Sequence, residues 1–514
     1  MVCLRQRGLS FTNTTSDAGS FTVSSGGELR VVGGEYDCRG NSSRIKYDGG
    51  KVTFAGDVSL MYPAVVTFGT GETVFDENAS FTKSASGGNI DVLPNAPGET
   101  AVLTLAAANA THHFRSPALV VGGCSCATGI FNSAAADLDD TDPTYIANGG
   151  TTFGFVAIGF EAGVGKMNVS GGKLLPGNYG FHIGTTHWGS DYYQISVDNV
   201  NAATGIVEMT GGTIVPSGWG YASAKFPCGL VIGDATRPLE GAKARVRGEF
   251  YLKGGSVEPN QNGTYIGVGY AEGCFVQTGG KMSHASGLTS ASGSVRYDDP
   301  NSNVFNFPFV VGLGGGIGSC VISNGTFSVD AANDVFVGGA TVADLAWCST
   351  CPWTLLGYSV DSHDAKGLFA VRGGDVSIGG SMYLGCDGTG ELELGATGKF
   401  SVGGDVVLSN KVASVLRVVL GERSVPDADI AGRIVISDAA KLVVDASAYS
   451  SGRIYTSLIY PKGGFAGEFS ADNIEIVLPV GADVRVPKCD VLTERDGVKG
   501  LWLYQQCGTV ISFR

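Results

Sequence analysis

The sequence predicts an all-β protein built as a right-handed parallel β-helix (a β-solenoid) with a C-terminal β cap. Glycine is very abundant, with 80 among 514 residues, and it separates short runs in which apolar and polar side chains alternate. Such alternation is typical of strands, and glycine permits sharp corners between them. Two short steps recur along the chain, and no segment of useful length shows the period of an α-helix.

The two recurring steps define the repeat. One is Gly-Gly-x-apolar, as in Gly373-Gly374-Asp375-Val376, and the other is apolar-apolar-Gly, as in Tyr383-Leu384-Gly385. They alternate about every 11 to 13 residues, so one cycle takes about 25 residues, within the range of repeats that stack into solenoids. Earlier Gly-Gly steps begin at Gly171, Gly211, Gly254 and Gly279, and earlier apolar-Gly steps end at Gly159, Gly184, Gly233, Gly267, Gly312 and Gly338.

Longer intervals between the steps indicate inserted loops. They fall at 185–204, 216–229, 234–247, 284–308 and 340–366. Insertions that leave the framework in register are expected of a solenoid with decorated turns. Because the insertions follow both kinds of step, we expect the loops to leave the rod from different faces.

The two ends of the chain differ in their strand pattern. Plain strands already occur near the start, for example at 28–32 and 101–105, whereas glycine becomes rarer and strands lengthen after 411. We expect 1–410 to form the β-helix with its inserted loops and 411–514 to form the last rungs and the cap. A cap is needed because open strand edges aggregate. Cys489 and Cys507 lie on opposite sides of an expected hairpin in the cap and could be bridged.

Composition and charge exclude some partners and favour a location. The net charge is −14 with no basic cluster, which argues against nucleic acid and anionic membranes. No apolar run has the length of a membrane helix, so we expect no integral membrane segment, and the start lacks the apolar region of a signal peptide. Richness in Gly, Ser, Thr and Asn, with sequons such as Asn168-Val169-Ser170, favours an extracellular or cell-surface location.

Twelve cysteines are scattered along the chain. Cys348-Ser-Thr-Cys351 has the spacing of half a zinc site, but no second pair or paired histidine completes it. We therefore expect a local disulfide or plain buried thiols.

An acidic run is a candidate for a calcium site. Asp137, Asp139, Asp140 and Asp142 lie in one predicted loop, and calcium takes six to eight oxygen ligands. The run lacks the glycine and the distant glutamate of a calcium-binding hand, so a solvated acidic turn is the simpler interpretation. We expect no cofactor, with calcium as the one ion that the sequence leaves open.

Aromatic residues in two inserted loops suggest a carbohydrate-binding surface. The candidates are Trp188, Tyr192, Tyr193, Trp219 and Tyr221, which stand beside polar side chains. Aromatic faces with polar neighbours suit sugar rings. The alternative is that these aromatics hold the loops against the wall of the solenoid, as large aromatics are mostly buried.

No pattern in the sequence identifies catalytic residues. β-Helices host pectate lyases and polygalacturonase-type glycosidases, which need paired carboxylates or clustered Asp with a basic residue. Asp298-Asp299 and Asp361-Ser362-His363-Asp364 are the nearest matches, both in inserted loops, where Asp, Ser and His are common for structural reasons. We assign no catalytic residue.

A family resemblance supports the predicted fold. The runs Gly388-Thr389-Gly390-Glu391-Leu392-Glu393-Leu394 and Gly403-Gly404-Asp405-Val406 resemble the passenger β-helices of autotransporter-type and related exported bacterial repeat proteins. Residues 465–469, 474–479 and 497–504 are similar to the closing strands of such passengers. The likeness covers about 150–514 and implies a surface or adhesin role, and it specifies no active-site residues.

The sequence therefore favours a non-enzymatic extracellular or cell-surface protein with a structural or adhesin-like role. Its expected partners are glycans or host and cell-surface molecules. The alternative is a polysaccharide-binding or polysaccharide-cleaving β-helix, pectate-lyase-like or glycosidase. Inserted loops that wall one groove with converging carboxylates would favour the alternative, and scattered loops on a smooth rod would favour a structural role.

Overall fold

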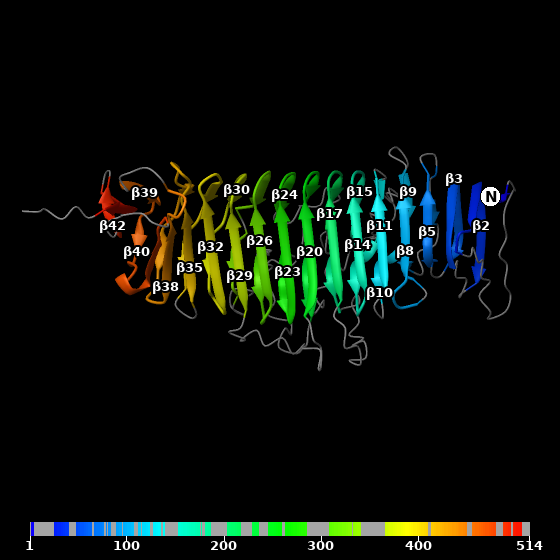
Figure 1. The fold of residues 1–514 in the computed structure, drawn as a ribbon, viewed down its shortest axis with the longest axis horizontal. Coiled ribbons are helices and arrows are strands. Elements are labelled where there is room, and N and C mark those ends of the chain that lie inside the picture. The colour runs from blue at the N-terminus through cyan, green and yellow to red at the C-terminus, as the bar shows by residue number, and fades with distance from the viewer. Residues whose placement is uncertain are drawn as a thin grey trace, which may run out of the picture.

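The computed structural model is a rod of stacked strands, with β1 and β2 at one end and the C-terminal cap at the other (Figure 1). It describes residues 2–4, 25–40, 48–63, 66–76, 79, 81–83, 89–94, 96–106, 111–114, 116–123, 127–134, 137–138, 153–174, 176, 180–186, 203–216, 229–235, 245–259, 263–284, 308–331, 333–340, 365–409, 413–449, 455–479, 487–494 and 497–505. The all-β prediction is confirmed: the described part holds strands and one short 3-10 helix, η2 (Ala471–Asn473).

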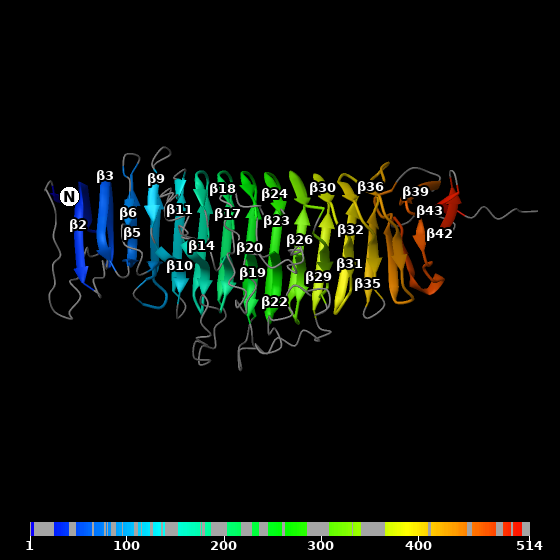
Figure 2. The same cartoon turned by 180° about the vertical axis from the view of Figure 1, so that it is seen from behind.

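Each full rung contributes one strand to each of three parallel ladders, which the two opposite views show from both sides (Figures 1 and 2). The first, which we call the long ladder, contains β1 (Val2–Leu4), β2 (Glu28–Gly40), β3 (Asp48–Pro63), β5 (Thr70–Phe75), β8 (Thr100–Leu105), β11 (Thr128–Ser133), β14 (Val164–Val169), β17 (Thr204–Met209), β20 (Val246–Leu252), β23 (Ala271–Gln277), β26 (Ile317–Ile322), β29 (Lys366–Val371), β32 (Thr389–Gly395), β35 (Ser414–Val419), β38 (Ala440–Asp445) and β41 (Ile474–Val477).

The short ladder follows the long ladder in each rung. It begins in the second halves of β2 and β3. It continues through β6 (Phe81–Lys83), β9 (Thr111–Phe114), β12 (Asp137–Leu138), β15 (Lys173–Leu174), β18 (Thr213–Ile214), β21 (Ser256–Val257), β24 (Lys281–His284), β27 (Thr326–Val329), β30 (Asp375–Ile378), β33 (Lys399–Val402) and β36 (Asp427–Ile430).

The third ladder is a separate 13-stranded sheet, which we call the side sheet. It contains β4 (Val66–Phe68), β7 (Ile90–Val92), β10 (Ser116–Gly123), β13 (Phe153–Phe160), β16 (Phe181–Thr185), β19 (Leu230–Ala235), β22 (Thr264–Gly269), β25 (Phe309–Leu313), β28 (Val335–Val337), β31 (Met382–Leu384), β34 (Val406–Leu408), β37 (Ile434–Ile436) and β40 (Phe465–Ala466). The parallel β-helix is confirmed, and its right-handed sense stays a prediction.

The interior is filled by columns of apolar side chains in register. In the long ladder, Met167 pairs with Val207, Val207 with Phe250, and Phe250 with Phe275. The same column continues through Cys320 and then Phe369, Leu392, Leu416 and Leu442, all buried. Because successive strand residues point to opposite sides, the alternation in the sequence places this column inside. Cys320 is thus one of the plain buried thiols that the sequence predicts.

Tight Gly-Gly corners join the long ladder to the short ladder. At Gly212 the backbone has φ of +79°, a region that other residues rarely adopt. A side chain there would also meet the preceding corner, since a Cβ atom would lie 2.6 Å from the carbonyl carbon of Gly171. The predicted role of the Gly-Gly steps as corners is confirmed.

We therefore expect Gly212→Val to lower the free energy of unfolding by more than about 1 kcal/mol through backbone strain. Thermal and urea unfolding of the variant and of Thr213→Val, its neighbour in β18, would measure this. An unchanged transition for Gly212→Val would show that the corner does not need a glycine.

A chain of side-chain to backbone hydrogen bonds supports the corner before the side sheet. Asp334 Oδ1 accepts the amide of Ser381 at 2.8 Å, and Ser381 Oγ accepts the amide of Asp405 at 3.2 Å. Asp405 in turn accepts the Arg433 amide at 2.7 Å and the Arg433 guanidinium at 3.0 Å. Four successive rungs are therefore linked along this border.

The last of these carboxylates gives a pH-dependent prediction. The Arg433 backbone amide, and then its side chain, hold the pKa of Asp405 below its ordinary 3.8. A lowered folded-state pKa stabilises the protein above the unfolded pKa, and this contribution is lost as the pH falls through the folded pKa. We expect Asp405→Asn to cost less than about 1 kcal/mol at pH 7, because both side chains are partly exposed to solvent, and to cost less at about pH 2 than at pH 7. Urea unfolding at both pH values tests this, and a constant difference would contradict it.

The C-terminal cap is an antiparallel sheet of β39 (Tyr455–Ile459), β43 (Val498–Gln505) and β42 (Pro487–Glu494), in that order. Leu458, Leu501 and Leu503 are buried and join the interior of the rod. The predicted hairpin is confirmed as β42 and β43. Cys489 is a buried free thiol in it, and burial raises its pKa to about 12, while Cys507 lies outside the described residues. The boundary proposed at 410 stays a prediction.

Candidate functional site

The inserted segments are joined to the rod at two of the three corners of a rung. Segments 187–202, 236–244 and 341–364 connect the side sheet to the long ladder, after β16, β19 and β28. Segments 217–228 and 285–307 connect the short ladder to the side sheet, before β19 and β25. The segments themselves lie outside the described residues, but their points of attachment are described.

Both of these corners border the side sheet. The strands β16, β19, β22, β25 and β28 are consecutive neighbours in it, so the five attachments fall within five adjacent rungs. The expectation that the loops leave from different faces needs correction. The corners do differ, but a rung has three sides, and these two corners are the opposite borders of one side.

The outer surface of the side sheet between these borders is apolar. Its central column runs through Val120, Ala157, His182, Val231, Tyr265, Val310, Phe336 and Tyr383 in register. All except Tyr383 are buried, and the rings of Phe336 and Tyr383 stack with centroids 5.2 Å apart. Parallel sheets are usually covered on both surfaces, and this part of the side sheet follows that rule.

One buried contact between a histidine and a carboxylate lies within this apolar surface. His182 on β16 and Asp234 on β19 approach to 3.5 Å between Nδ1 and Oδ2, with side chains 3% and 0% exposed. The His182 ring also contacts Phe155, with centroids 5.1 Å apart. Because both side chains are inaccessible, we interpret the pair as a structural link between adjacent rungs.

Glu161, at the border between the side sheet and the long ladder, has a strained backbone conformation. Glu161, which follows β13, is the one non-glycine residue with positive φ, +58°, in the described part of the chain. Burial raises the pKa of its carboxyl, and its amide donates to the Thr185 carbonyl at 3.1 Å. Strained residues often occur at functional sites. Sequence patterns did not reveal Glu161 or the His182–Asp234 pair, because both depend on contacts between rungs.

The sequence-predicted site residues are mostly outside the described part of the chain. This applies to all five carbohydrate-binding candidates, to Asp139, Asp140 and Asp142, and to the weak catalytic candidates Asp298, Asp299, Asp361, His363 and Asp364. The backbone of Asp137 lies in β12. Within the described ranges, no group of three or more His, Cys, Asp or Glu side chains is arranged to hold a metal ion.

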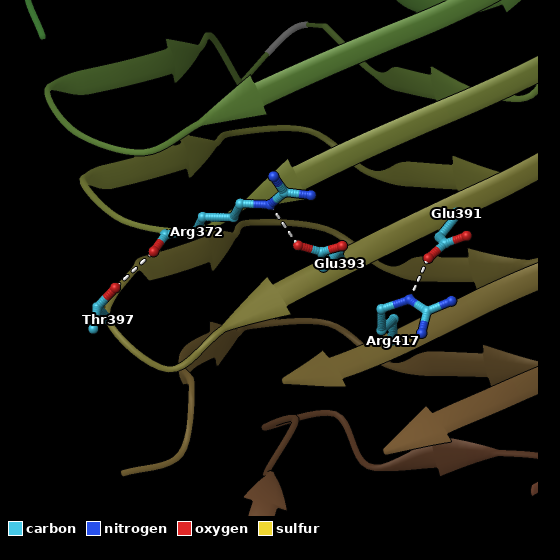
Figure 3. A network of polar contacts seen from close by, with 5 residues as sticks. All are labelled: Arg372, Glu391, Glu393, Thr397 and Arg417. Carbon is cyan, nitrogen blue, oxygen red and sulfur yellow. Dashed lines mark hydrogen bonds and ion pairs between the residues drawn. The ribbon is translucent and has the colours of Figure 1, made fainter. Parts of the chain in front are cut away.

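The outer surface of the long ladder has a different character, with ion pairs that link rungs. Arg417 on β35 donates to Glu391 on β32, and Arg372 donates to Glu393 at 2.7 Å (Figure 3). Arg372 also accepts a hydrogen bond from Thr397 through its carbonyl, at 2.6 Å. The hydrogen bonds from these arginines raise the pKa of both guanidinium groups. Exposed pairs of this kind contribute little stability each and provide no binding pocket.

Comparison with known proteins gives no family. No family model matches the chain, and no curated protein matches it. Among the described residues, no helix is long and apolar enough to cross a membrane.

Proposed function

We propose that this chain is a non-enzymatic extracellular or cell-surface protein with a structural or adhesin-like role, and that it contacts its partner through the segments inserted along the borders of the side sheet. The observation that supports the proposal is the attachment of five insertions along the two borders of five adjacent side-sheet strands. Binding residues commonly lie on loops held by a rigid scaffold, and a solenoid repeats such positions along its length.

Glycans are the partner class that the loop sequences favour. Trp188, Tyr192 and Tyr193 belong to the segment that follows β16, and Trp219 and Tyr221 to the segment that precedes β19. Since β16 and β19 are neighbouring strands, the two aromatic segments are attached at opposite ends of adjacent strands. Strands of five or six residues span about 17–20 Å. Both segments therefore belong to one stretch of the rod.

The second candidate function is a polysaccharide-binding or polysaccharide-cleaving protein. It is favoured by the same convergence, because an enzyme needs its acid and base on one surface. Asp299 lies in the segment before β25 and Asp364 in the segment after β28, and these strands are neighbours. Glu161 and Asp234 are a second pair of carboxylates near this surface, on either side of Thr185 and about 10 Å apart across two rung spacings. Asp234 is fully buried, so it could not reach a substrate.

The test uses immobilised galactomannan, xyloglucan and polygalacturonate as probes. We expect the protein to bind at least one of them, and Trp188→Ala with Trp219→Ala to weaken that binding at least about tenfold. Tyr251→Ala, which changes a half-buried tyrosine on the long ladder, should leave binding unchanged. No binding to any probe, or a double variant that binds every probe with unchanged affinity and capacity, would contradict the proposed glycan surface.

The same samples separate the two functions. We expect no new reducing ends and no unsaturated uronate product from polygalacturonate, with or without calcium. We also expect Asp299→Ala and Asp364→Ala to leave glycan binding intact. Cleavage that disappears with either substitution would replace the adhesive function by the enzymatic one.

A further inference from the structure

A second surface lies at the far end of the rod, on the outer side of the cap sheet. Cys489, Leu501 and Leu503 point into the interior and are buried. Because side chains alternate along a strand, Lys488 and Asp490 on β42, and Trp502 and Tyr504 on β43, point outward. In the antiparallel register Lys488 faces Tyr504, and Asp490 faces Trp502. These four side chains therefore form one patch, which we call the cap platform.

The aromatic part of the cap platform lies flat on the sheet. A Cβ atom at Gly500 would be 2.9 Å from Trp502 Nε1 and 2.9 Å from Tyr460 Cδ2, so both rings cover this glycine. The indole thus extends along its own strand instead of standing away from the sheet. Tyr460 is held there by a hydrogen bond from its hydroxyl to the Val498 carbonyl, at 3.3 Å. Trp502 is half-buried as a whole, and its Nε1 is fully buried, so the accessible part of the ring lies away from this nitrogen.

The polar part of the cap platform is preorganised beside these rings. The Tyr504 hydroxyl and Lys488 Nζ both bind the same carboxylate oxygen of Asp490, Oδ2, the latter at 3.0 Å. The hydrogen bond to Asp490 raises the pKa of both Tyr504 and Lys488. The Asp490 side chain is 30% exposed and Lys488 53% exposed. The Asp490 carboxylate and the Lys488 ammonium group are therefore held beside the aromatic rings and are accessible from solvent.

We propose that the cap platform binds a neutral polysaccharide. A sugar ring stacks its C–H face on Trp502, while Asp490 accepts a hydroxyl and Lys488 donates to another. Flat aromatic surface with rigid hydrogen-bonding groups at its edge suits a polyhydroxylated ring, because the apolar face and the hydroxyl rim are both matched. The net charge of −14 and the neutralisation of Lys488 by Asp490 disfavour an acidic polymer.

This inference goes beyond the proposed function, because neither the inserted segments nor the side sheet contribute to the cap platform. The two surfaces are therefore tested by separate variants of the full chain. Native affinity electrophoresis in gels that contain mixed-linkage β-glucan, galactomannan or xyloglucan measures retardation, and a gel with polygalacturonate is the acidic comparison.

The cap variants are made in the protein that carries Trp188→Ala and Trp219→Ala, so that the proposed side-sheet site is already removed. We expect at least one neutral polysaccharide to retard this parent protein. Trp502→Ala and Asp490→Ala should each weaken this binding at least about tenfold, as loss of a stacking ring or of a charged hydrogen-bond partner does. Trp502→Phe should retain most of it. Tyr251→Ala is the matched control, because Tyr251 also donates its hydroxyl to a carboxylate, Glu249, at 2.8 Å, but on the long ladder.

If Trp502→Ala perturbs the fold, Asp490→Ala still tests the cap platform, because Asp490 lies on the surface and its loss should not prevent folding. Absence of retardation by every neutral polymer, or retardation that survives both Asp490→Ala and Trp502→Ala, would overturn the inference. Retardation of the unmodified protein that is lost entirely in Trp188→Ala with Trp219→Ala would overturn it while supporting the proposed function.

Discussion

Replacing Gly273 by alanine is expected to lower the free energy of unfolding by at least about 3 kcal/mol, or to prevent folding. Gly273 lies on β23 where a Cβ atom would be 2.1 Å from the Ile232 carbonyl oxygen and 2.2 Å from the Gly267 amide nitrogen. Both obstacles are backbone atoms and cannot rotate away. The strands would have to separate at the junction of the side sheet and the long ladder, with loss of hydrogen bonds on both.

A similar loss of stability is expected for alanine at the equivalent positions along the junction of the side sheet and the long ladder. The same position of the long ladder is glycine in consecutive strands, at Gly165, Gly205, Gly248, Gly273, Gly318, Gly367 and Gly390. Gly497→Ala is the control, because Gly497 has positive φ but no atom within 4 Å of a Cβ, and should cost only about 1 kcal/mol. Equal denaturation midpoints for Gly273→Ala and the unmodified protein would show that the junction is not closely packed.

Leu503→Asp is expected to detach the cap and to cause association of the rods. Leu503 is fully buried on β43 and joins the interior at the end of the rod. A lone buried carboxylate costs about 3–5 kcal/mol, which is large beside the stability expected of a small β-sheet. Release of the cap would expose apolar side chains and strand edges, which pair between molecules.

Light scattering against protein concentration, together with urea unfolding, measures both effects. The control is Leu492→Asp, on the neighbouring strand of the same cap, where the leucine is 40% exposed. Leu492→Asp should remain as monodisperse as the unmodified protein. If Leu503→Asp behaves like the control, the cap does not close the rod through this side chain.

Local patterns in the sequence were enough to predict the rung framework. The Gly-Gly step at Gly212 and the apolar-Gly step at Gly233 recur because each rung needs the same corners, and corner chemistry is local. The buried column through Phe250 and Phe275 follows from alternation within single strands. The cap was predicted because strands lengthen and glycine becomes rarer after 411.

Features that depend on register between rungs could not be predicted in this way. His182 and Asp234 are brought together only by the pairing of β16 with β19, across the two inserted segments 187–202 and 217–228. The sequence shows two alternating steps, whereas a rung has three sides, and so the steps alone do not predict that the insertions border one common side. Trp502 and Asp490 face each other through the hairpin register, which no local motif specifies.

The central claim, that distant segments stack as parallel rungs in a fixed register, is tested most directly by cross-linking. Cys274 on β23 pairs with Ser319 on β26, and both are half-buried on the outer surface of the long ladder. Neighbouring strands are about 4.8 Å apart, within the Cα separation that a disulfide spans.

Ser319→Cys should therefore form a disulfide with Cys274 under mild oxidation, or react with both arms of dibromobimane, as mapped by mass spectrometry of the peptides. Val321→Cys, on the same surface but two residues further along β26, should not, since its Cα would be about 8 Å away. Cross-linking to Cys274 from position 321 but not from 319, or from neither, would contradict the register on which the account of the fold and its surfaces depends.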